Sequence, residues 1–338
     1  MPSKIRIGLV GTGLIARRAH LPALCADPDT EVVALASGRA DSARSAAAEF
    51  KVPQVYETWE ELVADPTVDA VDVCTINSLH APIAIAAAQA GKHVLVEKPM
   101  AVSLEQADAM VAAAESAGTV LMVAHNLRFI PLFAELQRIV AEGTLGRVLS
   151  ARASFMHAGP DEAWGASSDW FWREEAAGGG ALLDLGIHMI DLLRWTVGRE
   201  VTEVSALTAR LEKPTFAEDN AFLLMRFEGD VIAGLQTSWT ARPFPDTQMV
   251  IQGEKGRAVL GQSSKEPLVV YLAGAGGVNK VVPDLPEKSA FINPYVHFIR
   301  VIQGGERPLV DGREGRASLA VAIAAYESAR LGQVIRLA

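Results

Sequence analysis

A carboxylate and an imidazole stand four residues apart in the middle of the chain, at Asp184 and His188. Three glycines at 178–180 precede them, and apolar residues then recur at helical spacing, which predicts a glycine turn leading into an amphipathic helix over 178–195. Side chains four apart share one helix face, where the imidazole can transfer a proton and the carboxylate can orient it. The pattern equally fits a carboxylate favoured by the helix dipole beside a structural histidine.

Lys98 follows a predicted strand at 93–96 and precedes Pro99. Because proline constrains its neighbour, the lysine cannot continue into a helix, and we expect it to point into the crevice beyond the strand ends. An ammonium there can polarise a carbonyl or stabilise an alkoxide. The alternative interpretation is an ordinary surface lysine paired with Glu97.

A glycine-rich turn follows the first predicted strand, at 5–10, without a gap. In this turn Gly11 permits a tight bend, Gly13 lets the backbone approach a pyrophosphate, and Ala16 keeps the next helix close to the strand. The context predicts a dinucleotide site rather than a glycine turn without a ligand. The residues expected to contact the cofactor here are Gly11, Thr12, Gly13, Leu14 and Ile15.

The end of the second predicted strand, at 31–36, indicates which dinucleotide binds. An acidic residue there would bind the ribose hydroxyls of NAD, but the chain has Ser37 and Arg39 instead. A hydroxyl and a guanidinium suit the 2′-phosphate of NADP, so NADP is favoured and NAD stays possible. The competing interpretation makes Arg39 a solvated loop residue and Asp41 the N-cap of the next helix.

Further polar residues follow the later strands of the same half, where ligands of parallel sheets bind. We expect them near the nicotinamide, although an asparagine here can be a turn residue and a histidine a helix start. They are Thr75, Asn77, His80 and Glu97 together with Lys98 as cofactor contacts, and Asn126 as a substrate contact.

Three of the six tryptophans lie in an irregular segment at 156–175. Aromatic rings with interleaved polar groups can stack on the C–H face of a sugar or polyol ring and hydrogen-bond its hydroxyls. We expect His157, Trp164 and Trp172 to line that substrate site, with Asp184 and His188. Packing of the rings on a core is the equal alternative.

The elements that must position these residues form two domains. Strands alternate with helices through residues 1–125, which predicts a dinucleotide-binding domain with a parallel sheet. From 126 to 338 short strands joined by glycine turns predict an α/β domain with a mostly antiparallel sheet that binds substrate. Helices cover one face of that sheet, and we expect the other to meet a second subunit in a dimer or tetramer.

Composition excludes several classes of protein. The chain has 338 residues, half of them apolar, and a formal charge of −9, which lacks the basic surface that nucleic-acid binding requires. Cys25 and Cys74 show no metal-ligand spacing, and Asp184 and His188 have no recognisable third ligand, so we expect no metal. No signal peptide or membrane span is apparent, which favours a cytoplasmic protein without a membrane partner.

Together, the turn from Gly11 to Ala16, the triplet from Glu97 to Pro99 and the stretch from Gly179 to His188 resemble the glucose-fructose oxidoreductase, inositol dehydrogenase and rhizopine-catabolism protein family, Gfo/Idh/MocA. The resemblance covers nearly the whole chain. It implies a Rossmann domain, then an α/β domain with a large open sheet, and a triad of Lys98, Asp184 and His188 near the nicotinamide. The residues after the second strand resemble those of NADP-type members. No secretion leader like that of the periplasmic members with tightly held cofactor is apparent, so we expect an exchangeable cofactor.

The expected reaction is reversible hydride transfer between the nicotinamide and a secondary alcohol of a sugar, polyol or related cyclic diol. His188 is the expected general acid and base, Asp184 orients it, and Lys98 polarises the carbonyl, although Lys98 and His188 can exchange roles. Two other functions stay open. One is a redox-assisted, NAD-dependent glycosidase, and the other is a nucleotide-binding sensor without chemistry.

Overall fold

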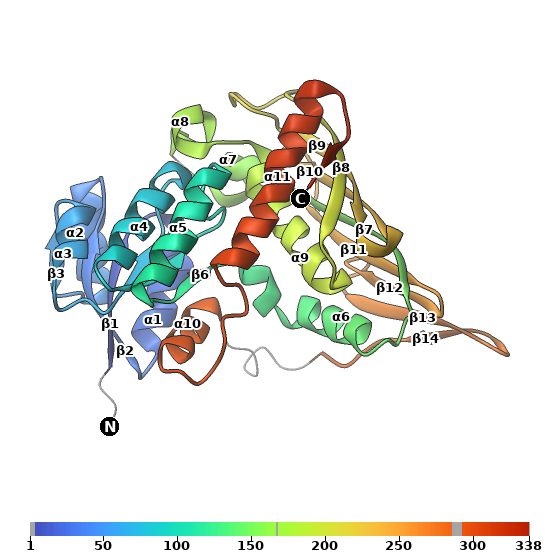
Figure 1. Cartoon of the computed structure of the whole chain (residues 1–338), viewed down its shortest axis with the longest axis horizontal. Coiled ribbons are helices and arrows are strands. Elements are labelled where there is room, and N and C mark those ends of the chain that lie inside the picture. Colours follow the sequence, from blue (N-terminus) through green and yellow to red (C-terminus); the bar gives the residue numbers. More distant parts are fainter. Residues whose placement is uncertain (1–3, 167, 286–292, 338) are drawn as a thin grey trace. The chain divides into compact units, whose positions relative to one another are not determined.

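The computed structural model describes residues 4–166, 168–285 and 293–337 (Figure 1). The chain divides into two compact units, and each is built from more than one segment. Unit 1 comprises Met1–Asn126, Glu175–Gly178 and Ile292–Ala317, and unit 2 comprises Leu127–Glu174, Gly179–Phe291 and Ser318–Ala338. This division differs from the predicted single boundary between 125 and 126, because two later segments return to unit 1.

Unit 1 contains a six-stranded sheet in the order β3-β2-β1-β4-β5-β6, and all of its strand pairs are parallel, as predicted. Parallel strands are covered by helices on both faces, which explains their nearly continuous apolar sequences. The strands are β1 (Ile5–Val10), β2 (Thr30–Ala36), β3 (Gln54–Tyr56), β4 (Ala70–Val73), β5 (His93–Val96) and β6 (Leu121–Val123).

Helical segments connect these strands. They are η1 (Ala16–His20), α1 (Leu21–Ala26), α2 (Ala40–Phe50), α3 (Trp59–Ala64), η2 (Asn77–Leu79), α4 (His80–Gln89), α5 (Leu104–Ala117) and, after β6, η3 (Asn126–Phe129). Side chains cap two of them, since Thr58 accepts a hydrogen bond at the start of α3 and Ser103 at the start of α5. The caps fix where each helix begins after its strand.

The helix α10 (Pro294–Ile302) explains why the late segment belongs to unit 1. Its buried side chains Tyr295, Phe298 and Ile299 join the hydrophobic cluster that contains Leu9 of β1 and Leu95 of β5. The apolar face of α10 would otherwise be exposed to water. Its partner strands lie far earlier in the sequence, at 5–10 and 93–96, which helical periodicity cannot reveal.

Unit 2 is built on a nine-stranded sheet in the order β14-β13-β12-β11-β7-β10-β9-β8-β15, in which only β7 and β10 pair in parallel among the described strands. The predicted, mostly antiparallel sheet is therefore confirmed. The strands are β7 (Val148–Met156), β8 (Val201–Ala209), β9 (Asn220–Phe227), β10 (Ile232–Ser238), β11 (Asp246–Gly253), β12 (Gly256–Leu260), β13 (Leu268–Gly274), β14 (Gly277–Val281) and β15 (Ile335–Arg336).

Helices cover one face of this sheet, where α9 contacts α6 and β7 (Figure 1). On β9, Leu223 and Met225 face the buried side, whereas Phe222 and Leu224 are 53% and 69% exposed on the other. The helical segments of unit 2 are α6 (Pro131–Ala141), α7 (Gly159–Trp164), η4 (Asp169–Trp172), η5 (Leu182–Gly186), α9 (Ile187–Val197), η6 (Glu228–Asp230) and α11 (Gly312–Leu331), which passes from unit 1 into unit 2 at Ser318. The short helix α8 (Glu174–Ala177) lies mostly in unit 1.

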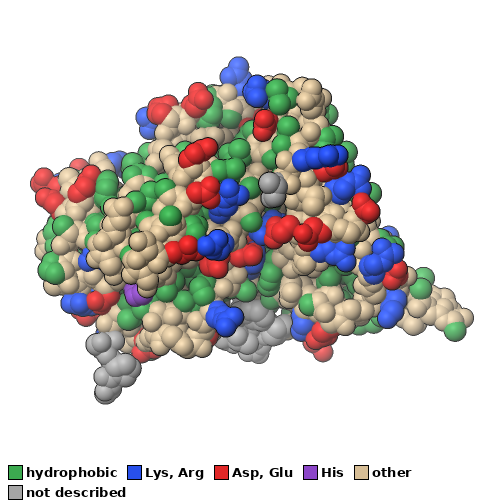
Figure 2. All heavy atoms as spheres, in the orientation of Figure 1, with side chains coloured by type: hydrophobic (Ala, Val, Ile, Leu, Met, Phe, Trp, Pro, Cys, Tyr) green, Lys and Arg blue, Asp and Glu red, His purple; other side chains and the backbone are tan. Residues whose placement is uncertain are grey.

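Surface composition and helix burial bear on possible partners. Acidic and basic side chains are interspersed on the face drawn in Figure 2, so no large patch of one sign dominates it. By length and composition alone, the helical stretch Glu174–Val197 could cross a membrane, yet 94% of its most apolar window is buried inside the protein. That degree of burial is typical of a core helix.

Candidate active site

The glycine turn after β1 lets other groups lie close to its backbone. Gly11 has a φ of 98°, and a Cβ at this position would lie 2.1 Å from the carbonyl oxygen of Cys74. A Cβ at Gly13, in contrast, would meet no heavy atom within 4 Å. The fold itself therefore requires the first glycine. The open space beside Gly13 fits a dinucleotide lying against the backbone.

The other residues of the turn connect it to its surroundings. Thr12 is buried, and its hydroxyl oxygen lies 2.8 Å from that of Ser42, which ties the turn to α2. Leu14 is half-buried and Ile15 is exposed, just before η1 begins. These positions at the start of a helical segment are suited to a bound phosphate.

A hollow of about 530 Å³ lies at the end of β2, lined by residues 39–42 and by Arg44. Arg39 is exposed, and its amide donates to Ser37 Oγ at 3.4 Å. Arg44 forms an ion pair with Asp41 at 2.7 Å. The N-cap of α2 is Arg39, without a side-chain cap hydrogen bond, so the alternative interpretation of Asp41 as the N-cap is wrong. Asp41 lies in the first helical turn, where the helix dipole favours an acid.

The polar residues after β4 are engaged with nearby backbone. The Asn77 side-chain amide donates to the carbonyl of Ala177 at 2.8 Å. The His80 ring is buried, with Nδ1 2.7 Å from the carbonyl oxygen of Pro99 and Nε2 3.3 Å from that of Thr75. Burial lowers the pKa of His80, so the ring is neutral and can donate only one of these bonds. The ring of His80 thus braces the strand ends of β4 and β5 against each other.

Lys98 lies two residues after the end of the buried strand β5 and is half-buried. Its backbone amide donates to Glu97 Oε2 at 3.0 Å. The other oxygen of Glu97 lies 3.0 Å from His20 Nε2. Glu97 therefore takes part in a buried network, which differs from the simple surface pair of the alternative interpretation.

Asp184 and His188 are both 7% exposed and lie in unit 2. Trp239 Nε1 donates to Asp184 Oδ2 at 3.1 Å, and the ring centroids of Phe155 and His188 are 6.0 Å apart. The predicted helix is present, and its first turn, at residues 182–186, is a π-helix that leads into α9. Such π-turns recur at functional sites.

The start of this π-turn is shaped by Glu218. A Cβ at Gly180 would lie 1.8 Å from the Glu218 carbonyl oxygen, so only glycine permits the approach. The Glu218 carboxyl accepts hydrogen bonds from Leu182 N at 2.8 Å and from the Tyr326 hydroxyl at 3.0 Å. Burial raises the pKa of Glu218 to about 7. A buried carboxyl that is only partly ionised at neutral pH thus satisfies an amide at the beginning of the turn.

The aromatic segment is half packed and half exposed. Trp164 and Trp172 are partly buried against the cluster of Ala181, Leu185 and Trp239. The ring centroids of His157 and Trp164 are 4.8 Å apart. The packing interpretation thus holds for part of each ring, and stacking of a substrate on the accessible part stays a prediction.

His157 and Asn126 occupy different units. His157 is buried in unit 2, and its Nδ1 accepts a hydrogen bond from Gly159 N at 2.9 Å. Asn126 is exposed, belongs to unit 1 and begins η3 after β6. Lys98 likewise belongs to unit 1, whereas the carboxylate and imidazole of the predicted triad belong to unit 2.

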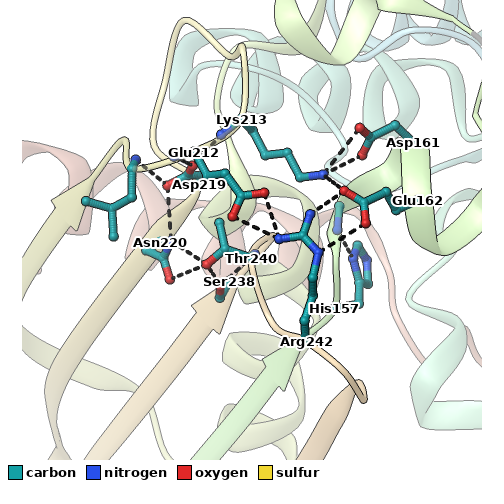
Figure 3. A network of polar contacts seen from close by, with 12 residues as sticks. His157, Asp161, Glu162, Glu212, Lys213, Asp219, Asn220, Ser238, Thr240 and Arg242 are labelled. Atoms are coloured by element: carbon teal, nitrogen blue, oxygen red, sulfur yellow. Dashed lines mark hydrogen bonds and ion pairs between the residues drawn. The ribbon is translucent and has the colours of Figure 1, made fainter.

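A charged network fixes the start of the aromatic segment (Figure 3). Lys213 Nζ lies 3.0 Å from Asp161 Oδ1 and 2.8 Å from Glu162 Oε1 of α7, and Arg242 also binds Glu162. The carboxylate of Asp219 accepts the backbone amides of residues 211–213 at 2.6–2.8 Å, which holds the loop of Lys213 in place. Three separate segments of unit 2 therefore position α7.

Sequence reasoning missed Trp239, Glu218 and Lys213, which contact the proposed site or its supports. Trp239 directly follows β10, and an aromatic residue at the end of a strand is ordinary in a core. The ability of its indole N–H to donate a hydrogen bond is the one signal that could have suggested Trp239. Glu218 and Lys213 lie in loops without a motif. Among the described residues, no group of three or more His, Cys, Asp or Glu side chains could hold a metal ion.

Two family models match the chain. The model described as an oxidoreductase family with an NAD-binding Rossmann fold matches residues 5–125, and the GFO/IDH/MocA C-terminal domain matches residues 133–259. Together they cover most of the chain, and their order agrees with the fold described above.

Similar proteins extend over the whole length. The chain is 34% identical to 1,5-anhydro-D-fructose reductase of Ensifer adhaerens, with 98% of each chain covered, and 29% identical to myo-inositol 2-dehydrogenase of Thermotoga maritima, again with 98% of each covered. Among solved structures, levoglucosan dehydrogenase in complex with NADH superposes with a TM-score of 0.87 at 26% identity, over 99% of this chain and 100% of that one.

These matches confirm the predicted family resemblance, the fold class and the oxidoreductase class. The chain belongs to the GFO/IDH/MocA family of oxidoreductases, with an N-terminal NAD-binding Rossmann domain and a family-specific C-terminal domain.

Proposed function

We propose that this enzyme transfers a hydride, with a preference for NADP(H), between the nicotinamide and a secondary alcohol or ketone of a sugar, polyol or related cyclic diol. The observation that carries the proposal is the buried pair of Asp184, on the π-turn, and His188, in the first turn of α9, in a chain whose other unit presents Lys98 two residues after a Rossmann strand. The names of the relatives, a reductase of an anhydrosugar and a dehydrogenase of an inositol, support this substrate class.

The dinucleotide would lie along the turn from Gly11 to Ile15. Gly13 leaves room for a pyrophosphate, and the amides at the start of the following helical segment face it. Thr75, Asn77 and Glu97 would border the nicotinamide end. When bound, the cofactor supplies the site that accepts or gives the hydride.

The preference for NADP rests on the hollow at the end of β2. Arg39 and Arg44 both line it, and Ser37 lies next to Arg39. Two guanidinium groups and a hydroxyl are suited to a phosphate monoester. The solved relatives with NAD or NADH in their names make NAD the competing cofactor.

The protein's own residues would handle the proton and the oxygen. On this proposal Lys98, Asp184 and His188 act on the substrate, and His188 takes or gives the proton of the hydroxyl. Asp184, held by Trp239, orients the imidazole or binds a neighbouring hydroxyl. Lys98 stabilises the negative charge that develops on the oxygen. An exchange of roles between Lys98 and His188 is the competing version.

The substrate would contact the accessible parts of Trp164 and Trp172, with His157 and Asn126 as polar contacts. Aromatic faces stack on the C–H face of a sugar ring, and the polar groups bind its hydroxyls. The network around Lys213 supports this role, because it anchors α7 and therefore Trp164.

We further propose that the enzyme is a homo-oligomer that associates through the uncovered face of the large sheet. Leu207 and Phe222 are cross-strand neighbours, 76% and 53% exposed, and Leu224 is 69% exposed beside them. They line a hollow of about 630 Å³ together with polar residues such as Gln236. A contiguous apolar patch of this kind on a sheet is typical of a surface that a second copy covers.

A screen of sugars, polyols and anhydrosugars with NADP and NAD tests the function. A dehydrogenase changes the absorbance of added cofactor in step with substrate, a redox-assisted glycosidase releases sugar without net cofactor change, and a sensor does neither. Coupled turnover with a member of these classes supports the proposal. Sugar release alone, or no change with any compound, contradicts it.

A further inference from the structure

A buried histidine with no part in the proposed reaction lies between two carboxylates of unit 1. His20 ends η1, the helical segment that follows the glycine turn, and it is completely buried. Its Nδ1 lies 2.8 Å from Asp72 Oδ2, and its Nε2 lies 3.0 Å from Glu97 Oε1. Asp72 is 1% exposed, so the carboxylate has almost no access to water.

This arrangement requires a charged ring. A neutral imidazole has one N–H and one lone pair, so one of its nitrogens would face a carboxylate oxygen without a proton between them. Only the imidazolium donates to both acids. Burial opposes the charge, but the negative charge of Asp72 outweighs it and raises the pKa of His20 well above its ordinary value.

The other groups that face His20 are neutral at pH 7. Cys74 Sγ lies 3.7 Å from Nε2, and the ring of Tyr295 on α10 is centred 4.2 Å from the imidazole. Burial raises the pKa of both Cys74 and Tyr295, so neither carries a charge at neutral pH. Asp72 and Glu97 are therefore the charged groups that determine the state of His20.

Glu97 connects this histidine to Lys98. Burial opposes the charge of the Glu97 carboxylate. The hydrogen bond and the charge of His20 nevertheless lower the pKa of Glu97, which keeps this carboxylate ionised. One carboxylate oxygen accepts from His20 and the other accepts from the backbone amide of Lys98 at 3.0 Å. The orientation of this carboxylate thus fixes the point at which the Lys98 side chain begins.

We propose that His20 is a positioning residue for Lys98, acting through the carboxylate of Glu97. The inference rests on the proposed function in that it takes Lys98 to act on the substrate oxygen. His20 also ends the segment after the glycine turn, so one buried cation joins the cofactor-binding turn, β4 and the end of β5.

A purely structural role is the competing explanation, in which His20 serves only to neutralise Asp72. The variant His20→Gln leaves two buried carboxylates without a cation and is expected to lose stability. The double variant His20→Gln/Asp72→Asn also removes the charge of Asp72, and its two amides can hydrogen-bond without charge. Glu97 still lacks its imidazolium partner in this variant. A purely structural role therefore predicts normal activity of the double variant, whereas a positioning role predicts a loss.

The test measures kcat, the KM for cofactor and the backbone amide resonance of Lys98 in the wild type and in the double variant. We expect kcat to fall ~10- to 100-fold, since a small misplacement of a reacting group has effects of this size. The KM for cofactor should stay within about twofold, and the Lys98 amide resonance should move. The matched control His93→Gln changes a histidine at the other end of β5 and should alter none of these values.

The charge of His20 is measured in the wild-type protein by NMR of its ring nitrogens, assigned through the backbone. We expect both nitrogens to carry protons at pH 7. If the double variant does not fold, the same quantities are measured in Glu97→Gln. This variant removes the charge of the Glu97 carboxylate and leaves His20 and Asp72 in place.

A neutral His20 ring would overturn the inference, as would wild-type kcat and an unmoved Lys98 amide in the folded double variant. Failure of the proposed function is a separate result. It would appear as the absence of cofactor-coupled turnover in the wild type, while the NMR measurements would still report the charge of His20 and its link to Lys98.

Discussion

At the scale of single residues, hydrogen bonds to buried groups decide what each candidate can do. Trp239 fixes one oxygen of Asp184, and Glu97 divides its two oxygens between His20 and the backbone of Lys98. Residue type and spacing could single out the lysine, aspartate and histidine. They could not indicate the supporting groups, because Trp239 is distant in sequence and becomes a neighbour only when β10 is in place.

The cofactor preference is tested at Arg39. On the proposed NADP binding, alanine at this position would remove a charge-assisted hydrogen bond to the 2′-phosphate, and such a bond is worth about 1.5–3 kcal/mol. We expect Arg39→Ala to lower kcat/KM for NADP by ~10-fold or more and to leave the value for NAD nearly unchanged. Steady-state kinetics with both cofactors give the comparison. An equal effect on NADP and NAD would show that Arg39 does not select between them.

The raised pKa of Glu218 predicts a dependence of stability on pH. Its pKa is about 7 in the folded protein against an ordinary value of 4.5, because the carboxyl is buried. Between these values the folded state keeps a proton that the unfolded state releases, so stability falls as pH rises from about 4.5 to 7, by about 3 kcal/mol. Glu218→Gln cannot ionise and should lack this loss.

Thermal unfolding at pH 5 and pH 8 measures the effect. The Tm of the wild type should fall more between the two values than the Tm of Glu218→Gln. The control Glu327→Gln changes an exposed acid on the same helix as Tyr326 and should behave as the wild type does. Parallel Tm changes in all three proteins would argue against a buried proton on Glu218.

At the scale of elements, sequence periodicity predicted most strands and helices but not their irregular turns. Both glycine-rich segments lead into π-turns, Ala16–His20 and Leu182–Gly186. An apolar pattern with helical spacing fits α and π geometry almost equally. The local choice depends on tertiary contacts, such as the carbonyl of Glu218 against Gly180, which a single sequence does not contain.

Gly180 gives the prediction at this scale. A Cβ there would collide with the Glu218 backbone, so Gly180→Ala must displace the start of the π-turn. We expect a loss of about 2 kcal/mol and a Tm lower by about 4–8 °C, with reduced turnover. Gly276→Ala is the control, because a Cβ at that position meets no heavy atom within 4 Å. Equal Tm values for the two variants would contradict this account.

At the scale of the whole molecule, the sequence predicts the two sheets, because strands alternate with helices before residue 126 and follow one another after it. The sequence does not predict that a late segment of the chain returns to unit 1. α10 packs with β1 and β5 through Tyr295, Phe298 and Ile299. An amphipathic helix reveals that it has a buried face, but not which sheet buries it. The same limit applies in unit 2 to the uncovered face of the large sheet, because the sequence does not reveal what covers it.

Self-association through that face is tested with Leu224→Arg. A charge in the apolar patch of Leu207, Phe222 and Leu224 should oppose association, and we expect sedimentation velocity to show a smaller particle than the wild type. Val278→Arg is a matched control on the edge strand β14, where Val278 is 73% exposed. An unchanged mass for Leu224→Arg would place any interface elsewhere.

The proposed reaction is hydride transfer supported by a proton relay at His188. The most direct measurement compares the wild type with His188→Ala by the absorbance of the reduced nicotinamide, across sugars, polyols and anhydrosugars with NADP and NAD. We predict coupled turnover of at least one of these compounds by the wild type. In His188→Ala, kcat should fall by about two orders of magnitude or more while the Kd for cofactor is unchanged. Absence of coupling in the wild type, or unchanged turnover in the variant, would contradict the account.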